Sequence, residues 1–230
     1  MKNLVILTGA GISAESGLKT FRDSDGLWNN YSIYEVATPD AWLANPALVL
    51  EFYNHRRTEL KDTKPNDAHF ALTELEKAFN THIITQNVDN LHERAGASRV
   101  LHLHGQLTQA RGEYTFDSVE NIGYKNIQLG DMNESGEQLR PHIVLFGEDV
   151  PEIMNAAKIC ENADFFLVIG TSLQVYPAPG LVHAIPPQCT VFVIDPKAEQ
   201  IAIQNKIVLI KEKAGTAVPA LVKMLLDSNS

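Results

Sequence analysis

The N-terminal segment reads Asn3-Leu-Val-Ile-Leu-Thr8 and continues as Gly9-Ala-Gly11-Ile-Ser-Ala14-Glu-Ser-Gly17. A short apolar run that enters a Gly-x-Gly turn and then a helix-forming stretch is typical of the first βα unit of a dinucleotide-binding fold. Gly9 allows a tight turn, Gly11 lets a diphosphate approach the backbone, and Ala14 is small enough for helix and strand to lie close. The alternative is a purely structural βα turn.

Further apolar runs predict strands, and most are apolar throughout, as parallel strands covered on both faces are. These predicted strands are Leu4–Thr8, His82–Thr85, Val100–Leu103, His142–Phe146, Phe165–Ile169, Thr190–Ile194 and Ile207–Ile210. Helical patterns lie between several of them, at Pro46–Lys61, Asp67–Phe79, Pro151–Glu161 and Val218–Leu226. The alternation predicts an α/β fold with a Rossmann-like, doubly wound parallel sheet.

Two segments depart from this alternation. Residues 22–62 contain no strand pattern, and residues 106–140 are polar, with only a weak strand signal at Tyr114–Phe116. We expect the two insertions to form a small lobe on a single catalytic domain that spans residues 1–230. The large lobe would then comprise about 1–21, 63–105 and 141–230. A cleft between two lobes is a common place for a ligand.

Charge and cysteine content exclude several classes of protein. The 230 residues include 28 acidic and 19 basic side chains, and the net charge of −9 argues against nucleic-acid binding. No apolar run approaches the roughly 18 residues that span a bilayer, and the strand pattern begins at Asn3, so we expect a cytoplasmic protein without a membrane partner. Cys160 and Cys189 are the only cysteines and are expected to be buried, reduced thiols.

Polar clusters follow several of the predicted strands. They are Gln86-Asn-Val-Asp-Asn90, His104-Gly105, Gly147-Glu148 and Gly170-Thr-Ser172. In open α/β sheets, ligands bind outside the carboxyl ends of the strands. A single such cluster is usually a turn, but several beside a glycine turn predict a binding site.

These motifs resemble those of the sirtuins, the NAD-dependent protein lysine deacylases. The matching residues are Gly9–Gly17, Phe21-Arg22-Asp23, Thr85–Asn90, His104-Gly105, Phe146-Gly147-Glu148 and Gly170-Thr171-Ser172, in order through nearly the whole chain. The resemblance implies a Rossmann lobe and a small lobe, with NAD and an acyl-lysine protein substrate meeting in the cleft. The implied products are free lysine, nicotinamide and 2′-O-acyl-ADP-ribose.

The resemblance also implies roles for individual residues. His104 is the implied base for the ribose hydroxyls, which suits an imidazole with a pKa near neutrality, and Asn87 is its catalytic partner. Gln86, Asn87 and Asp89 would hold the nicotinamide and ribose. The full expected NAD site is Gly9, Ala10, Gly11, Ile12, Ser13, Glu15, Phe21, Arg22, Trp28, Gln86, Asn87, Asp89, Gly170, Thr171, Ser172, Asp195 and Ala214.

The substrate side has a distinctive pair. Tyr53 and Arg56 stand three apart and share one helix face. They look like the sirtuin subset that accepts acidic acyl groups such as succinyl, since an arginine and a phenol can bind a distal carboxylate. The alternative is a surface arginine stacked beside a tyrosine. The expected substrate-binding residues are Tyr53, Arg56, Ile143, Val144, Phe146, Gly147 and Val175, with Glu148 structural.

Some of these residues could also have a purely structural role or a different function. Ser13 and Glu15 could simply cap and charge the first helix. His102 and His104 form a His-x-His pair that also suits a metal site, but no third ligand pattern lies nearby, so no metal is expected.

The sequence departs from the family pattern in two places. Typical sirtuins carry two cysteine pairs for a structural zinc between the His104 and Phe146 motifs, and residues 106–140 contain no cysteine. We expect a zinc-free lobe with solvated acidic residues, packed by Leu107, Tyr114, Phe116, Val119, Ile122, Tyr124 and Ile127. Asp195 stands where many relatives have Asn, near the adenosine ribose.

Two other functions remain open at this point. An NAD-dependent mono-ADP-ribosyltransferase would use the same cofactor, although ribosyl transfer would not need His104. A non-catalytic NAD-binding module would follow if the altered small lobe no longer closed.

Overall fold

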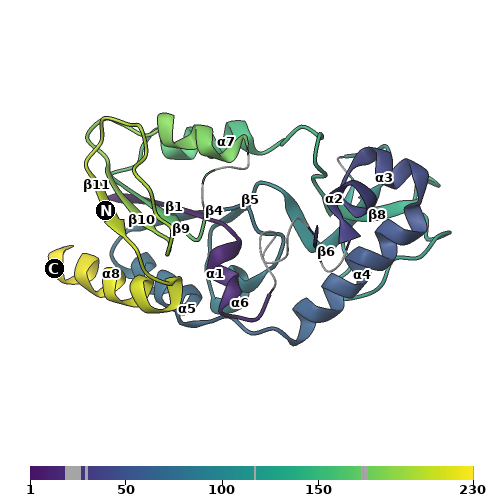
Figure 1. The fold of residues 1–230 in the computed structure, drawn as a ribbon, viewed down its shortest axis with the longest axis horizontal. Helices are drawn as coiled ribbons and strands as arrows, with labels where there is room; N and C mark the ends of the chain where they lie inside the picture. Colours follow the sequence, from purple (N-terminus) through teal and green to yellow (C-terminus); the bar gives the residue numbers. More distant parts are fainter. Residues whose placement is uncertain (19–26, 29–30, 117, 172, 174–175, 230) are drawn as a thin grey trace.

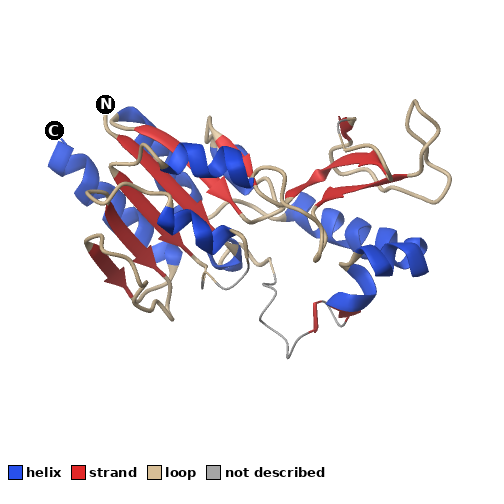
Figure 2. Ribbon diagram, turned by 90° about the horizontal axis from the view of Figure 1, so that it is seen from above, coloured by secondary structure: helices blue, strands red, loops and turns tan. Residues whose placement is uncertain are grey.

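The computed structural model describes residues 1–18, 27–28, 31–116, 118–171, 173 and 176–229, with only the backbone at 27–28 and 229. Its larger part is one parallel sheet (Figure 2). The strands are β1 (Asn3–Thr8), β4 (Asn80–Thr85), β5 (Val100–His102), β9 (Phe165–Ile169), β10 (Thr190–Ile194) and β11 (Ile207–Ile210), in the order β11-β10-β9-β1-β4-β5. The predicted α/β class and parallel sheet are therefore confirmed.

The strand order changes direction beside β1. From β1 the chain passes to β4 on one side, and it later returns to β9 on the other. Such a switch point is where open α/β sheets leave a crevice for ligands. The glycine turn after β1 lies at this point and leads into α1 (Ala10–Ala14).

Helices cover both faces of the sheet (Figure 1). Leu4 and Ile6 pack on α5 (Asp67–Glu74) and α8 (Ala214–Asn229), whereas Val5 and Leu7 pack on α7 (Ile153–Cys160) and the 3₁₀ helix η2 (Ala178–His183). Because successive strand residues face opposite sides, β1 is buried throughout. The short helices η1 (Leu75–Lys77) and α6 (Leu91–Ala95) complete this lobe.

A second, antiparallel sheet belongs to the small lobe, on the right of Figure 1. It has the order β7-β6-β8, from β6 (Gly105–Gly112), β7 (Val119–Asn121) and β8 (Leu139–Ile143). The same lobe contains β2 (Leu27–Trp28), β3 (Tyr31–Ser32), α2 (Ile33–Val36), α3 (Pro39–Ala44) and α4 (Pro46–Asp62). Its core joins Trp42 and Phe52 to Leu107 and Ile143.

Sequence motifs explain where the small-lobe helices begin. Ser32 and Glu35 form a capping box on α2, Thr38 caps α3, and Asn45 caps α4, with proline at the first position of α3 and α4. Each cap satisfies amide N–H groups that the helix leaves unpaired.

The predicted strand at His142–Phe146 is wrong. The strand is β8, it ends at Ile143, and it pairs antiparallel with β6 rather than with the parallel sheet. The strand signal at Tyr114–Phe116 is also misplaced, since β6 ends before it and β7 begins after it. An apolar run indicates a strand but does not say which sheet it joins.

The predicted packing of the small lobe is partly wrong. Leu107 and Ile127 are buried, but Tyr114, Phe116 and Val119 are 74%, 52% and 41% exposed. Tyr114 and Phe116 lie between β6 and β7, and Val119 begins the edge strand β7. The Phe116 ring lies 3.9 Å from the Arg111 guanidinium carbon.

The acidic residues of this lobe are not all merely solvated, contrary to prediction. Glu113 accepts a hydrogen bond from Trp42 Nε1 at 2.9 Å. Glu137 accepts from the backbone N–H groups of Tyr114 and Thr115, and from Thr115 Oγ1. Glu137 thus pairs two backbone amides of its lobe, whereas Glu113 pairs the Trp42 indole of α3. Asp117 lies outside the described residues.

Candidate active site

A cleft of about 400 Å³ lies between the two lobes. Its walls come from the carboxyl ends of β1, β4, β9 and β10, from α4, and from the segment after β8. Most of the predicted site residues line it: Gly9, Ala10, Gly11, Ser13, Tyr53, Arg56, Gln86, Asn87, Asp89, His104, Ile143, Val144, Phe146, Gly147, Gly170, Thr171 and Asp195. Segments far apart in the sequence therefore converge here.

The glycine turn is packed against the end of β9. Gly11 N–H donates to Gly170 C=O at 2.8 Å, and a Cβ on Gly11 would lie 2.6 Å from Gly170 Cα. Gly170 has φ +62°, and a Cβ there would lie 2.4 Å from Ile12 N. The described contacts thus explain Gly11 by its approach to Gly170. That Gly11 also lets a diphosphate approach the backbone stays a prediction.

Asn87 holds the floor of the cleft together. Its Nδ2 donates to Gly9 C=O at 3.1 Å and to Ser13 Oγ at 3.2 Å, and its N–H donates to Thr85 Oγ1 at 3.0 Å. Ser13 in turn donates to Asp89 Oδ2 at 2.9 Å. Ser13 is therefore part of a buried polar network rather than a helix cap.

Asp89 is a buried carboxylate. Burial raises its pKa, and the hydrogen bonds from Leu91 N–H and Ser13 Oγ, with the nearby His102 ring, act in the opposite direction. Each carboxylate oxygen retains a further lone pair beyond these bonds. The group can therefore still accept a hydrogen bond from a ligand in the cleft.

His104 lines the same cleft from the turn between β5 and β6. Its Nδ1 lies 2.9 Å from Gln86 C=O. Because a carbonyl only accepts, Nδ1 must carry the hydrogen, and Nε2 of the neutral ring is left as the basic nitrogen. Burial lowers the pKa of His104, partly offset by this hydrogen bond. Gln86 Nε2 also donates to Thr171 Oγ1 at 3.1 Å.

Tyr53 and Arg56 enter the cleft from α4. Arg56 is only 8% exposed, so the alternative of a surface arginine is wrong. Burial lowers the pKa of Arg56, while Tyr53, Glu59 and Asp89 act in the opposite direction. Burial likewise raises the pKa of the Tyr53 phenol. The pair is a buried cation next to a neutral donor.

The segment after β8 forms the opposite wall. Val144 N–H donates to His104 C=O at 3.0 Å, and Phe146 N–H donates to Ala37 C=O at 2.9 Å. Glu148 accepts from Arg140 at 2.9 Å and from Leu145 N–H at 2.7 Å. These bonds support the structural interpretation of Glu148, since they hold the wall in place.

Three predicted cofactor residues do not line the cleft. Ile12 is fully buried in the core, Ala214 is buried at the start of α8, and Glu15 accepts from Gly215 N–H at 2.7 Å. Phe21, Arg22, Ser172 and Val175 lie outside the described residues, as does the Trp28 side chain.

Several residues that line the cleft are not among the predicted site residues. They are Leu18, Ala37, Val88, Leu107, Leu145, Val150, Tyr176 and Lys197. Most are apolar and reach the cleft through the packing of the two lobes, so no local pattern marks them. Lys197 could have been found, because it follows Asp195 and its N–H donates to Asp195 Oδ1 at 2.8 Å.

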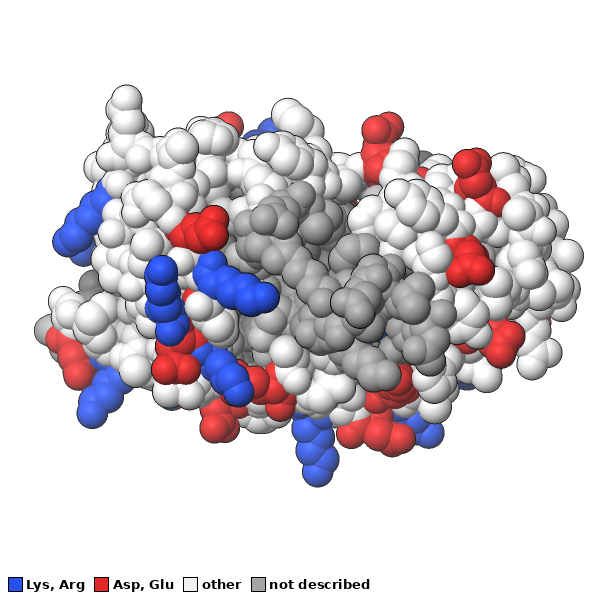
Figure 3. Space-filling view, in the orientation of Figure 1, with Lys and Arg blue, Asp and Glu red and all other residues white. Residues whose placement is uncertain are grey.

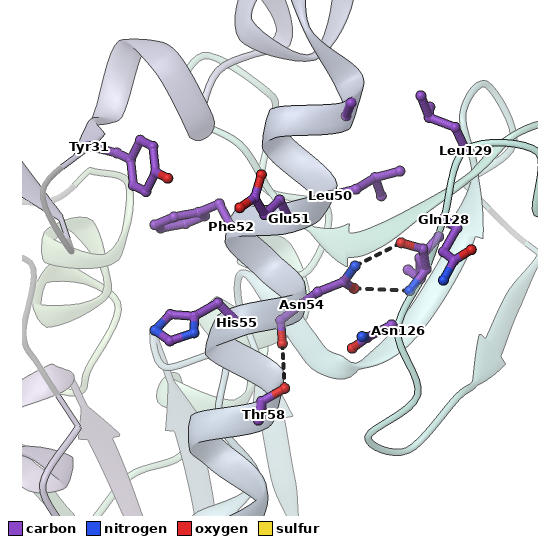
Figure 4. Close-up of a pocket in the computed structure, with 12 residues that line it drawn as sticks. Tyr31, Leu50, Glu51, Phe52, Asn54, His55, Thr58, Asn126, Gln128 and Leu129 are labelled. Carbon is purple, nitrogen blue, oxygen red and sulfur yellow. Dashed lines mark hydrogen bonds between the residues drawn. The ribbon is translucent and has the colours of Figure 1, made fainter.

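A second hollow, of about 960 Å³, lies in the small lobe between α4 and residues 126–129 (Figure 4). Asn54 Nδ2 donates to Ile127 C=O at 2.8 Å, and its Oδ1 accepts from Ile127 N–H at 2.9 Å. This paired amide ties residues 126–129 to α4. Within the described ranges, no three His, Cys, Asp or Glu side chains gather as metal ligands.

Comparisons with known proteins agree with this arrangement. The Sir2 family model matches residues 9–177. An NAD-dependent protein deacylase of Bacteroides thetaiotaomicron is 49% identical over 99% of this chain and its own full length, and one of Helicobacter pylori is 50% identical over the full length of both chains. A crystal structure of a Sir2 homologue in complex with NAD superposes with a TM-score of 0.89 at 38% identity, covering 100% of this chain and 91% of that one. The chain therefore belongs to the Sir2 family.

Proposed function

We propose that this chain is an NAD-dependent protein lysine deacylase that releases nicotinamide and 2′-O-acyl-ADP-ribose. The observation that carries the proposal is the His104 ring, which lines the cleft with Nδ1 bonded to Gln86 C=O and Nε2 free to act as a base. The names of the relatives at about half identity support the same activity.

The residues present fit NAD. The cleft combines the glycine turn of β1, the carboxylates Asp89 and Asp195, and amide and hydroxyl groups of Gln86 and Thr171. Gly9 to Gly11 would lie along the pyrophosphate, Asp89 would accept from the carboxamide, and Asp195 would accept from a ribose hydroxyl. When bound, NAD supplies a nicotinamide that leaves readily from its glycosidic bond.

The residues of this chain then do the proton and positioning work. His104 Nε2 takes a proton from a ribose hydroxyl, and the Gln86 carbonyl keeps the ring in the tautomer that can do so. Asn87, fixed by Gly9 and Ser13, keeps its position beside the reacting groups. The wall at Ile143, Val144, Phe146 and Gly147 would hold the peptide around the lysine.

We further propose that Tyr53 and Arg56 accept an acidic acyl group, such as succinyl, in addition to acetyl. The Arg56 guanidinium lines the cleft, where it can donate charge-assisted hydrogen bonds to the distal carboxylate of a succinyl group. The neutral Tyr53 hydroxyl adds a second donor.

The remaining expectations belong to the same proposal. The small lobe would fold without zinc, with Asn54 and Glu137 fixing loops in that region. The lobes would form one domain over residues 1–230, with the small lobe at about 22–62 and 106–140. Two buried free thiols, Cys160 and Cys189, support a cytoplasmic location.

Acyl-lysine proteins are the proposed partners, without a nucleic-acid or membrane partner. Acidic side chains predominate over the small lobe on the face in Figure 3, which favours lysine-bearing substrates over phosphate backbones. No helix in the described part of the chain is long and apolar enough to cross a bilayer.

One assay separates the proposal from its alternatives. The protein is incubated with NAD and an acyl-lysine peptide, and the products are weighed by mass spectrometry. We expect the peptide to lose the acyl mass while 2′-O-acyl-ADP-ribose appears. Gain of ADP-ribose by the peptide or protein would instead identify a transferase, and NAD binding without any product would identify a non-catalytic module.

A further inference from the structure

His102 lies beneath the cleft and has no role in the proposed chemistry. It is the last residue of β5, it is buried, and it does not line the cleft. Its Nδ1 lies 3.0 Å from Asn87 C=O, and its Nε2 lies 2.7 Å from Glu93 Oε1 on α6. The ring thus bridges the segment after β4 to the helix that follows it.

The two partners determine how the ring is protonated. Asn87 C=O can only accept, and the Glu93 carboxylate can only accept when ionised. Either neutral tautomer of His102 would leave one ring lone pair facing an oxygen lone pair. With Glu93 ionised, only a ring with a hydrogen on both nitrogens, and therefore a positive charge, satisfies both contacts.

The other charged and titratable groups around the ring are Asp89, His92 and His142. Asp89 is buried and benefits from a nearby positive charge. His92 and His142 have pKa values lowered mainly by burial, so both are neutral near pH 7. Of these rings, His102 is the one whose two nitrogens both face acceptors.

The carbonyl that His102 holds belongs to a residue whose other polar groups are already fixed. Asn87 N–H is bonded to Thr85, and its side-chain amide is bonded to Gly9 and Ser13. The bond from His102 ties Asn87 C=O to β5 and, through Glu93, to α6.

We propose that His102 is a positioning residue, held as an imidazolium by Glu93, which orients the Asn87–Asp89 segment for the nicotinamide end of NAD. The inference rests on the proposed function for the identity of the ligand. The contact with Asn87 predicts an effect on NAD and nicotinamide. Because the described hydrogen bonds of His102 go to Asn87 and Glu93, and not to the peptide wall, we expect little effect on the acyl peptide.

The ring charge is tested first, without any substrate. Nitrogen-15 NMR of the histidine-labelled protein at pH 7 is expected to show one histidine with both ring nitrogens protonated, absent in His102→Gln. In Glu93→Gln the amide of the new glutamine can donate to His102 Nε2. The His102 ring is therefore expected to become neutral in this variant. A His102 ring already neutral in the unaltered protein would overturn the inference.

Kinetics test the positioning role. In His102→Gln we expect the KM for NAD and the inhibition constant for nicotinamide to rise about tenfold. A rise of this size corresponds to the loss of one charge-assisted hydrogen bond. The KM for the acyl peptide should stay within about twofold. Glu93→Gln, which can retain the Asn87 bond, should give a smaller rise. Equal changes in both KM values would indicate general damage and contradict the inference.

His55→Gln is the matched control, because it removes an exposed histidine–glutamate pair in which His55 Nε2 lies 3.3 Å from Glu59 Oε1. It should leave both KM values unchanged. The NMR result does not depend on catalysis, so absence of deacylation would count against the proposed function alone. Normal deacylation with a neutral His102 would count against this inference alone.

Discussion

His104 shows how burial prepares a single side chain for its role. Removing the ring from water disfavours its charged form, and the Gln86 carbonyl fixes the hydrogen on Nδ1. Both effects keep a basic Nε2 available near neutral pH.

The lowered pKa of His104 predicts the acidic side of the pH profile. A base is lost as pH falls through its own pKa, and this pKa lies below the ordinary value of 6.5. The decline of kcat/KM on the acidic side should therefore have an apparent pKa below 6.5. A decline centred above 6.5 would show that another group limits the reaction.

Arg56→Met tests the acyl pocket. Losing the guanidinium should lower desuccinylation about 10- to 100-fold, because a charge-assisted hydrogen bond disappears, and deacetylation only a few-fold. The measurement is kcat/KM on matched succinyl and acetyl peptides, with the exposed Arg99→Met as control. Equal losses on both peptides would refute the assignment.

At the scale of elements, the site depends on the contact between the β1 turn and the end of β9. Gly9 N–H donates to Ile169 C=O at 3.0 Å, and Gly11 meets the backbone of Gly170. These bonds bring the two strands beside the switch point close enough for their turns to share one wall of the cleft.

Gly170→Ala should therefore be costly. The new Cβ would overlap the backbone of Gly11 and Ile12, and φ +62° is unfavourable for alanine, so we expect a loss of about 3 kcal/mol in the free energy of unfolding. At Gly136 φ is +78°, and a new Cβ would have no atom within 4 Å. Gly136→Ala therefore measures the cost of the backbone conformation alone, which should be about 1 kcal/mol in the free energy of unfolding. Urea unfolding of both variants makes the comparison; equal losses would mean that overlap at Gly170 contributes nothing.

Sequence predicts some of these elements better than others. The continuous apolar runs of β1, β9 and β10 predict buried parallel strands, because both faces need covering. β6 has no apolar run that could mark it, because it buries polar residues such as Thr108 and Arg111. The apolar run of β8 does not show that this strand pairs with β6. Motifs supplied most cleft residues, whereas Leu18 and Val150 arrive only through tertiary packing.

At the scale of the whole molecule, two lobes with separate cores define the cleft. The sheet lobe has a core on each face, and the small lobe has its own around Trp42 and Phe52. Hydrogen bonds of Asn54 and Glu137 fix the loops in the region where relatives are expected to carry zinc cysteines.

Metal analysis tests the zinc-free lobe. The purified protein should contain well under one zinc per chain, and a strong chelator should leave its thermal unfolding midpoint unchanged. One firmly bound zinc per chain would refute this expectation.

The most direct test of the central claim compares His104→Ala with the unaltered protein in two assays on the same preparation. Loss of the base should reduce deacylation by about 10²- to 10⁴-fold, while calorimetry should still detect NAD binding. Unchanged turnover in His104→Ala, or no NAD binding by the unaltered protein, would contradict the account.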